Sequence, residues 1–366
     1  MAYTRDQIYQ VLEELGIRNW MRNAQVVGND IILDIVSPSP AMHERKRLEI
    51  ALKNAFKENL PEANLTLNIS VEVEEKNPNE IKGSELPGVK NIIAVASGKG
   101  GVGKSTVSAN LAISLANMGF KVGVLDADIY GPSMPIMFDC QDARPYSVEV
   151  NGKTKIKPVE AYGIKILSIG FFADTDQAIV WRGPMAAKAL NQMIRDAHWG
   201  DLDFLLIDLP PGTGDIHLSI VQQVPITGAI VVSTPQTIAL ADARKGVGMF
   251  QMEAINVPVL GIVENMAYFT PEELPNNKYY IFGQNGAKHL AEQISVPFLG
   301  EIPIVQSIRE AADVGRPAAL QEGTIVAEVY KNIARNTVQS LVERNTTLPP
   351  TEAVRITTMA GCSAKN

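Results

Sequence analysis

Apolar and polar residues follow two different patterns along the chain, and the pattern changes near residue 85. In the first part, Thr4 and Gln7 have the spacing of a capping box, which predicts a helix at the start. Two short apolar runs on either side of Gly28 predict a hairpin, and apolar residues at helical spacing after Pro40 predict a second helix. Strict alternation over 65–73 predicts a further strand. The order α-β-β-α-β indicates a small α+β domain over 1–75.

The second part alternates near-continuous apolar runs with helical segments. Strands that are apolar on both faces and joined by helical crossovers predict a mostly parallel, doubly wound sheet covered on both sides. The expected strands are Ile92–Ala96, Lys121–Leu125, Phe204–Leu209, Ala229–Ser233 and Val259–Val263. We therefore expect an α/β domain over 90–345, a proline- and glycine-containing charged linker over 76–89, and a C-terminal tail over 346–366.

Composition and charge limit the partners and the cell compartment that we expect for this protein. The chain has 366 residues, of which 46% are hydrophobic and 20% charged, as in ordinary globular proteins, and its net charge is −7. A negative net charge disfavours nucleic acid and anionic lipid as partners, so we expect no nucleic-acid and no membrane partner. The start of the chain has no basic segment followed by an apolar run, and only Cys140 and Cys362 occur. Both observations predict a cytoplasmic protein in a reducing compartment.

The most specific chemical signal follows the first strand of the larger domain, where the sequence fits G-x-x-x-x-G-K-[ST]. Glycines allow backbone N–H groups to approach phosphate oxygens, and the helix that follows presents unpaired N–H groups at its start. Lys104 supplies a charge for the β- and γ-phosphates of ATP, and the Ser105 hydroxyl is expected to bind Mg²⁺. The predicted ATP-binding stretch is Gly98, Lys99, Gly100, Gly101, Val102, Gly103, Lys104, Ser105 and Thr106.

Acidic residues end two of the predicted strands. Asp126 and Asp128 close one strand, and Asp208 closes another. The carboxyl ends of parallel strands carry the ligands of doubly wound sheets, so Asp208 is expected to hold Mg²⁺ directly or through water. Gly212, four residues later, is expected to donate its N–H to the γ-phosphate. The alternative interpretation is that these acids cap helices or turns.

Lys99, directly after the first glycine, adds a second lysine to the phosphate loop. This deviant form resembles that of the dimerising ATPases of the Min, Par and nitrogenase-iron-protein groups. Further motifs resemble the Mrp/ApbC family of iron–sulfur cluster carriers, over about residues 88–345. They are Asp126–Ser133 (DADIYGPS), Trp181–Met185 (WRGPM), Asp208–Asp215 (DLPPGTGD), Glu264–Met266 (ENM), Ile302-Pro303 and Ile308–Pro317 (IREAADVGRP). The first domain resembles the MIP18-like domain that often precedes such ATPases.

The resemblance implies a Mg²⁺-dependent ATPase that acts as an iron–sulfur cluster carrier or assembly factor for apo-protein clients. It also implies a homodimer in which Lys99 reaches the nucleotide of the other subunit and offsets charge in the transition state. Asp128 is then expected to orient the attacking water. The expected catalytic residues are Lys99, Lys104, Asp128 and Asp208. Asn265 is expected to bond the adenine edge, with Pro303 in the same ATP site. Arg182 is expected on the dimer face.

The cysteines depart from the family pattern. The family places Cys-x-x-Cys shortly after the ENM segment, but residues 267–277 contain no cysteine. Cluster ligation needs soft thiolates, four for a [4Fe–4S] centre, so Cys362 in the tail is the remaining candidate ligand. Cys140 is interpreted as a small buried hydrophobe. The alternatives that stay open are an ATP-gated protein-interaction module and a positioning ATPase, both without a cluster.

Overall fold

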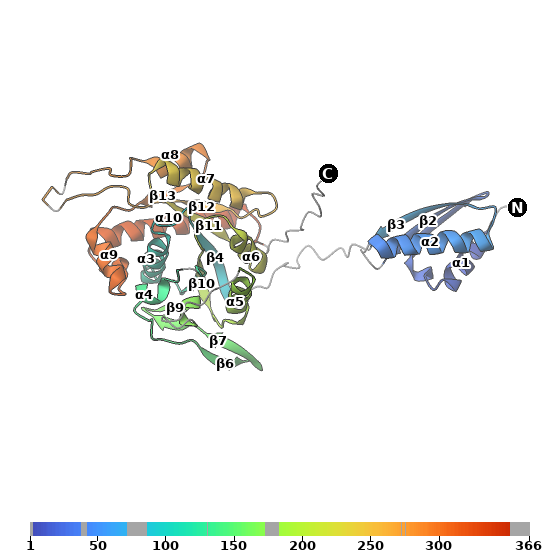
Figure 1. Cartoon of the computed structure of the whole chain (residues 1–366), viewed down its shortest axis with the longest axis horizontal. Helices are drawn as coiled ribbons and strands as arrows, with labels where there is room; N and C mark the ends of the chain where they lie inside the picture. The colour runs from blue at the N-terminus through green and yellow to red at the C-terminus, as the bar shows by residue number, and fades with distance from the viewer. Residues whose placement is uncertain are drawn as a thin grey trace. The chain divides into compact units, whose positions relative to one another are not determined.

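The computed structural model describes residues 3–37, 42–71, 86–129, 131–172, 183–271, 273–274 and 276–351. The chain separates into two compact units, Met1–Glu80 and Ile81–Asn366 (Figure 1). Each unit has its own hydrophobic core.

The smaller unit contains a three-stranded sheet and two main helices. Strands β1 and β2 form an antiparallel hairpin, and β3 pairs in parallel with β2 because the second helix crosses over between them. Apolar residues at alternate strand positions, such as Ile31 and Leu33, pack on Leu12 and Phe56 of the helices. The elements are α1 (Arg5–Glu14), η1 (Arg18–Trp20), β1 (Met21–Val27), β2 (Asp30–Ser37), α2 (Met42–Asn59) and β3 (Asn64–Val71). The predicted order α-β-β-α-β is confirmed.

The larger unit is built around an eight-stranded sheet. Neighbouring strands are parallel throughout, except that the edge strand β8 runs antiparallel to β9. Across the sheet the strands are β13 (Phe298–Glu301), β12 (Val259–Glu264), β11 (Gly228–Ser233), β4 (Val89–Ala96), β10 (Leu202–Asp208), β5 (Val122–Asp126), β9 (Ile164–Ser168) and β8 (Val159–Ala161). The predicted mostly parallel, doubly wound sheet is confirmed.

Helices cover both faces of this sheet because its central strands are apolar on both sides. In β4, Ile93 and Val95 belong to one core, whereas Ile92 and Ala94 belong to the other. The first core includes residues of α3 (Lys104–Asn117), α4 (Met134–Met137), α9 (Gln306–Asp313) and α10 (Ile325–Thr347), and η3 (Ala318–Leu320) packs with them. The second includes residues of α5 (Gly183–Asp196), α6 (Asp215–Gln223), α7 (Thr237–Gln251) and α8 (Gly286–Gln293). Figure 1 shows α3 and α4 on the opposite side of β4 from α5 and α6.

Several features of the larger unit differ from the sequence prediction, which did not include strands β13, β9 and β8 of the main sheet. An antiparallel pair, β6 (Tyr146–Val150) and β7 (Lys153–Lys157), and the short η2 (Ile169–Phe171) were not expected. Helix α10 runs to Thr347, two residues beyond the end predicted for the α/β domain at 345, and the hydroxyls of Thr346 and Thr347 each donate to the Glu343 carbonyl at 2.8 Å and close the last turn. The sequence analysis made no structural prediction for the long connection between β12 and α8.

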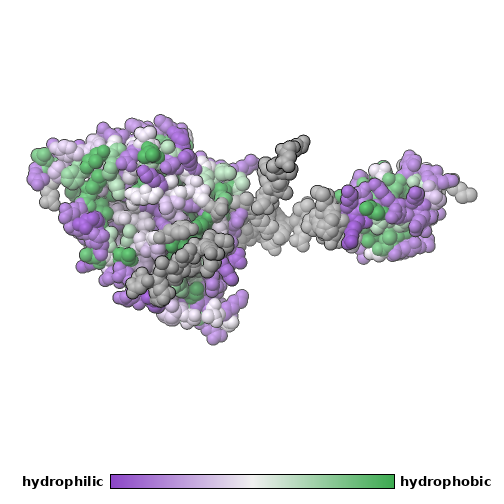
Figure 2. Space-filling view, viewed as in Figure 1, coloured by the Kyte–Doolittle hydropathy of each residue, from purple (hydrophilic) through white to green (hydrophobic). Residues whose placement is uncertain are grey.

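That connection carries exposed apolar side chains. Phe269 and Tyr279 exchange two backbone hydrogen bonds, so its two arms run antiparallel. Figure 2 shows apolar residues gathered at the left edge of the larger unit, where Figure 1 places this loop. The exposed side chains are Phe269, Leu274, Tyr279, Tyr280 and Ile281. We call these five residues the apolar loop patch.

Candidate functional site

The glycine-rich loop connects the carboxyl end of β4 to the start of α3. Gly103 is the residue before the helix and has φ of 83°, in the left-handed region that favours glycine. A Cβ atom at Gly103 would lie 2.2 Å from Nδ2 of Asn265, which comes from the end of β12. The last glycine of the motif is therefore required by both its backbone angle and a close neighbour.

Gly98 is required for a different reason. A Cβ atom there would lie 2.2 Å from the backbone carbonyl carbon of Asp242 in α7. Helix α7 thus packs directly on the entry to the loop. The sequence motif explained this glycine by phosphate approach, whereas the structure adds a packing requirement that acts without any ligand.

Asp208 is the centre of a buried polar cluster beneath the loop. It lies at the end of β10 and is fully buried, and its Oδ2 accepts hydrogen bonds from Lys104 Nζ at 2.7 Å and from Ser105 Oγ at 2.6 Å. Its Oδ1 accepts from Ser108 Oγ at 2.6 Å. The structure therefore brings together Lys104, Ser105 and Asp208, which the sequence analysis placed at one site. Each buried donor and acceptor in this cluster is paired, as a low-dielectric interior requires.

Asp126 forms a second buried cluster on the neighbouring strand β5. Its carboxylate accepts from the Asp128 N–H at 3.2 Å, the Met134 N–H at 3.1 Å and Ser168 Oγ at 2.9 Å. Complete burial, and then the nearby Asp208 carboxylate, raise the pKa of Asp126 to about 7. These hydrogen bonds fix the segment after β5, and with it Asp128, against the sheet.

Two cavities meet above the loop. The first, of about 260 Å³, is lined by the loop itself together with Asp128, Gly131, Ser133 and Pro211. The second, of about 520 Å³, has mostly apolar walls that include Met137, Asn265, Phe282, Pro303 and Ile304. Gly103, Thr106 and Met137 line both. A cavity lined by the glycine loop beside a mostly apolar one has the arrangement that a nucleotide needs for its phosphates and its base.

The remaining expected site residues lie as follows. Lys99 is exposed on the loop, and its carbonyl accepts from Ser97 Oγ at 3.0 Å. Gly212 donates its N–H to the Ser97 carbonyl at 2.9 Å, so this donor already holds the loop. Asn265 is buried and donates from Nδ2 to the Val102 carbonyl at 2.8 Å, which makes it a support of the loop.

Ser108 is the functional residue that the sequence analysis missed. It stands four residues after Lys104, and that spacing places both side chains on the same face of α3. The spacing was readable, but a serine inside a helix is common, and only the fold shows that Asp208 faces it.

Thiol chemistry is limited within the described residues. Cys140 is buried, and burial together with Asp139 raises the pKa of its thiol to about 11, so it is neither nucleophilic nor a ready ligand. No group of three or more His, Cys, Asp or Glu side chains in the described ranges is arranged to hold a metal ion. Cys362 and Arg182 lie outside the described residues.

No helix of the described chain is long and apolar enough to cross a membrane.

Comparisons with known proteins agree with this geometry. A family model described as "ParA: NUBPL iron-transfer P-loop NTPase" matches residues 88–338. The chain is 50% identical over 254 residues to an iron-sulfur cluster carrier protein of Aquifex aeolicus, covering 69% of this chain and 68% of that one. It is 48% identical over 260 residues to an iron-sulfur protein required for NADH dehydrogenase of Arabidopsis thaliana, covering 70% and 81%.

A solved structure is also similar. A nucleotide-binding protein from Archaeoglobus fulgidus in complex with ADP aligns with a TM-score of 0.56 and 40% identity, over 63% of this chain and 89% of that chain. The resemblance noted from the sequence motifs is confirmed for the larger unit. The family model begins at residue 88, so the MIP18-like resemblance of the smaller unit stays a prediction.

Proposed function

The chain belongs to the family of ParA-type NUBPL iron-transfer P-loop NTPases, and from this premise we propose that it is a Mg²⁺-dependent ATPase whose nucleotide cycle serves iron–sulfur cluster transfer. The observation that carries the nucleotide part is the buried cluster of Lys104, Ser105 and Asp208 directly under the glycine loop. The cluster-transfer part is supported by relatives that are named as cluster carriers.

The residues present suit Mg²⁺. This cation prefers oxygen ligands and usually takes one or two from the protein, with the rest from phosphates and water. The Ser105 hydroxyl and the Asp208 carboxylate, 2.6 Å apart, offer two such oxygens beside the phosphate cavity. Bound Mg²⁺ would neutralise phosphate charge, and Ser105 and Asp208 would hold it. Lys104 is placed to bind the β- and γ-phosphates.

The catalytic assignment rests on Asp128 and Lys99. Asp128 lines the phosphate cavity at a position fixed by Asp126, where a carboxylate can orient a water molecule for attack. Lys99 is exposed on the glycine loop, directly before Gly100 of the cavity lining, and is available to a second subunit. We place it in the nucleotide site of the partner in a homodimer, as a cation that offsets charge in the transition state.

Nucleotide binding and turnover separate these roles. Lys104→Ala should abolish binding of Mg–ATP in calorimetry, whereas Lys99→Ala should bind normally and hydrolyse much more slowly. Asp128→Asn should bind ATP and accumulate as a dimer in analytical ultracentrifugation. Normal hydrolysis by Lys99→Ala would refute the role in trans, and a wild type that gives no heat with Mg–ATP would refute the whole proposal.

The cluster is cargo in this proposal. Cys140 is buried with a raised thiol pKa, so it does not fit as a ligand, and a carrier of this sequence would hold its cargo through Cys362 and through thiolates of the client. Anaerobic reconstitution with iron and sulfide, followed by visible absorption and iron and sulfide analysis, tests this in the wild type and in Cys362→Ser. A spectrum that is identical in both would remove Cys362 as a ligand, and no chromophore in either would remove cluster binding.

The second candidate is an ATP-gated interaction module without a cluster. It is favoured by the apolar loop patch, which stands where the family carries its cysteines and offers aromatic and aliphatic side chains instead. Client binding that depends on ATP but persists in the double variant Cys140→Ser with Cys362→Ser would establish it. Loss of client binding in that variant would instead favour the carrier function.

A further inference from the structure

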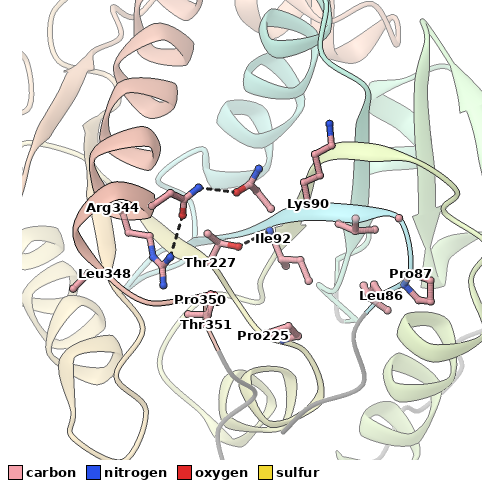
Figure 3. A pocket seen from close by; sticks show the side chains of 14 residues that line it. Leu86, Pro87, Lys90, Ile92, Pro225, Thr227, Arg344, Leu348, Pro350 and Thr351 are labelled. Atoms are coloured by element: carbon pink, nitrogen blue, oxygen red, sulfur yellow. Dashed lines mark hydrogen bonds between the residues drawn. The ribbon is translucent and has the colours of Figure 1, made fainter. Parts of the chain in front are cut away.

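A third cavity lies at the opposite end of the sheet from the nucleotide site. Its volume is about 460 Å³, and it is formed where β4 begins, where the chain enters β11 and where α10 ends. Since β4 leads from this cavity to the glycine loop, the two sites are separated by the length of that strand, roughly 25 Å. Its apolar walls are Leu86, Pro87, Ile92, Pro225, Leu348 and Pro350 (Figure 3).

Arg344 is the unusual residue in this cavity. Its side chain is only 8% exposed, and its Nε makes no hydrogen bond within the described chain. Nη1 donates to Asn345 Oδ1 at 3.0 Å and Nη2 to the Pro349 carbonyl at 2.7 Å, both of which are uncharged acceptors. Burial lowers the pKa of Arg344, and no carboxylate of the described residues opposes that effect. A buried cation without a counter-charge is costly, so the fold holds this guanidinium ready for an anion.

A row of amides fixes the orientation of the arginine. Asn345 Nδ2 donates to Asn91 Oδ1 at 3.2 Å, and Asn91 Nδ2 donates to the Asp203 carbonyl at 3.0 Å. The amide oxygen of Asn345 is therefore turned toward Arg344. Figure 3 shows the Arg344 guanidinium above Pro350 and Thr351. The guanidinium keeps Nε–H and one N–H on each terminal nitrogen for a ligand, which is a two-pronged donor.

The charge at the cavity limits the ligand to a single negative charge. The other cation of the lining, Lys90, is already paired with Asp203 at 2.8 Å. One uncompensated guanidinium matches one carboxylate, because both carry a single charge and the two oxygens of the carboxylate fit two N–H donors. A phosphate dianion would leave one negative charge unbalanced. We propose that this cavity is a carboxylate-binding site, in which Arg344 holds the anion and the apolar walls hold the group that bears it.

Two sources can supply this carboxylate. One is the chain itself, because Glu85 directly precedes the lining residue Leu86 and Glu352 directly follows the lining residue Thr351 in the sequence. The other is a free carboxylate from solution. The chemistry at Arg344 is the same for both, and the experiment below separates them.

The test measures the thermal midpoint of the full chain in sodium acetate against sodium chloride at equal ionic strength, with Mg–ADP saturating the glycine loop so that it contributes no anion effect. Acetate should raise the midpoint of the wild type by about 2 °C or more and leave that of Arg344→Gln unchanged. Arg335→Gln is the matched control, because Arg335 lies on the same helix, is exposed and does not line the cavity. It should respond like the wild type.

If the carboxylate comes from the chain, the wild type should not respond, and the double variant Glu85→Gln with Glu352→Gln should gain an acetate response that Arg344→Gln removes. Should Arg344→Gln fail to fold, the Nε–H resonance of Arg344, identified by its absence in Arg344→Lys, must move with acetate in the wild type or in the double glutamine variant. The proposal is overturned if acetate moves neither the midpoint nor this resonance in either protein, or if Arg344→Gln responds as the wild type does.

Discussion

The buried contact between Ser108 and Asp208 allows a quantitative test of how the nucleotide site is held together. Ser108 Oγ lies 2.6 Å from Asp208 Oδ1, and both side chains are fully buried. Ser108→Ala removes this donor and adds no bulk. The Oδ1 atom then keeps its burial but loses the one side-chain donor that it has among the described residues, while Lys104 and Ser105 still bond Oδ2.

The expected loss follows from the chemistry of the acceptor. A hydrogen bond to a charged group contributes about 1.5–3 kcal/mol to stability, more than the roughly 1 kcal/mol of a neutral pair. No large cavity forms, since only one oxygen atom is removed. We therefore expect Ser108→Ala to lower the free energy of unfolding of the larger unit by about 2–3 kcal/mol.

The assay is urea unfolding followed by the fluorescence of Trp199, which is 2% exposed in the core of the larger unit. A background with Trp20→Phe and Trp181→Phe leaves Trp199 as the reporting tryptophan. Ser114→Ala is the matched control, because Ser114 is buried on the same helix α3 and is not among the side chains that bond Asp208. The control should lose less than about 1 kcal/mol. An equal loss in the two variants, with equal slopes in urea, would refute the view that Asp208 depends on Ser108.

Three further outcomes follow from the site. Burial and a neighbouring carboxylate raise the pKa of Asp126 from 3.8 to about 7. The stability that Asp126 contributes is therefore complete below pH 3.8 and is lost as the pH rises through about 7. Asp126→Asn should flatten this part of the plot of urea midpoint against pH, and an unchanged plot would contradict the assignment. Gly103→Ala should destabilise the protein by about 1–3 kcal/mol and weaken ADP binding, with partial rescue by Asn265→Ala in calorimetry; full additivity would argue against their contact. In Cys362→Ser the remaining thiol, Cys140, should react with a disulfide reagent far more slowly than after unfolding, and equal rates would show that it is exposed.

The five central strands of the sheet and their parallel arrangement were predictable because their signals are local, whereas the order of the strands was not predicted. Each central strand is a continuous apolar run, and the helices between them leave a parallel arrangement as the natural solution. The pair β6 and β7 escaped this reasoning because most of its residues are exposed or half-buried, which gives no apolar run. A local signal was nevertheless present: Asn151 and Gly152 form its turn with φ of 51° and 71°, the angles that Asn-Gly pairs favour in tight hairpins.

The glycine loop, Lys104 and Asp208 were likewise predictable, since motif spacing and strand ends specify them. The partners that hold them in place were not. Ser168 reaches Asp126 from β9, 42 positions away, and Asn265 reaches the Val102 carbonyl across 163 positions. Such contacts depend on strand order and register, which a single sequence does not state.

Asn265 connects the nucleotide site to the apolar loop patch by a short physical route. Its side chain holds the carbonyl of Val102 in the glycine loop, and its backbone begins the connection between β12 and α8 that carries the patch. Met266 and Phe282, at the two ends of that connection, both line the apolar cavity beside Gly103. A base bound there would touch both ends of the loop at once. The carrier and the interaction module both require that nucleotide state reach a partner surface, and we infer that this contact is the route in either case.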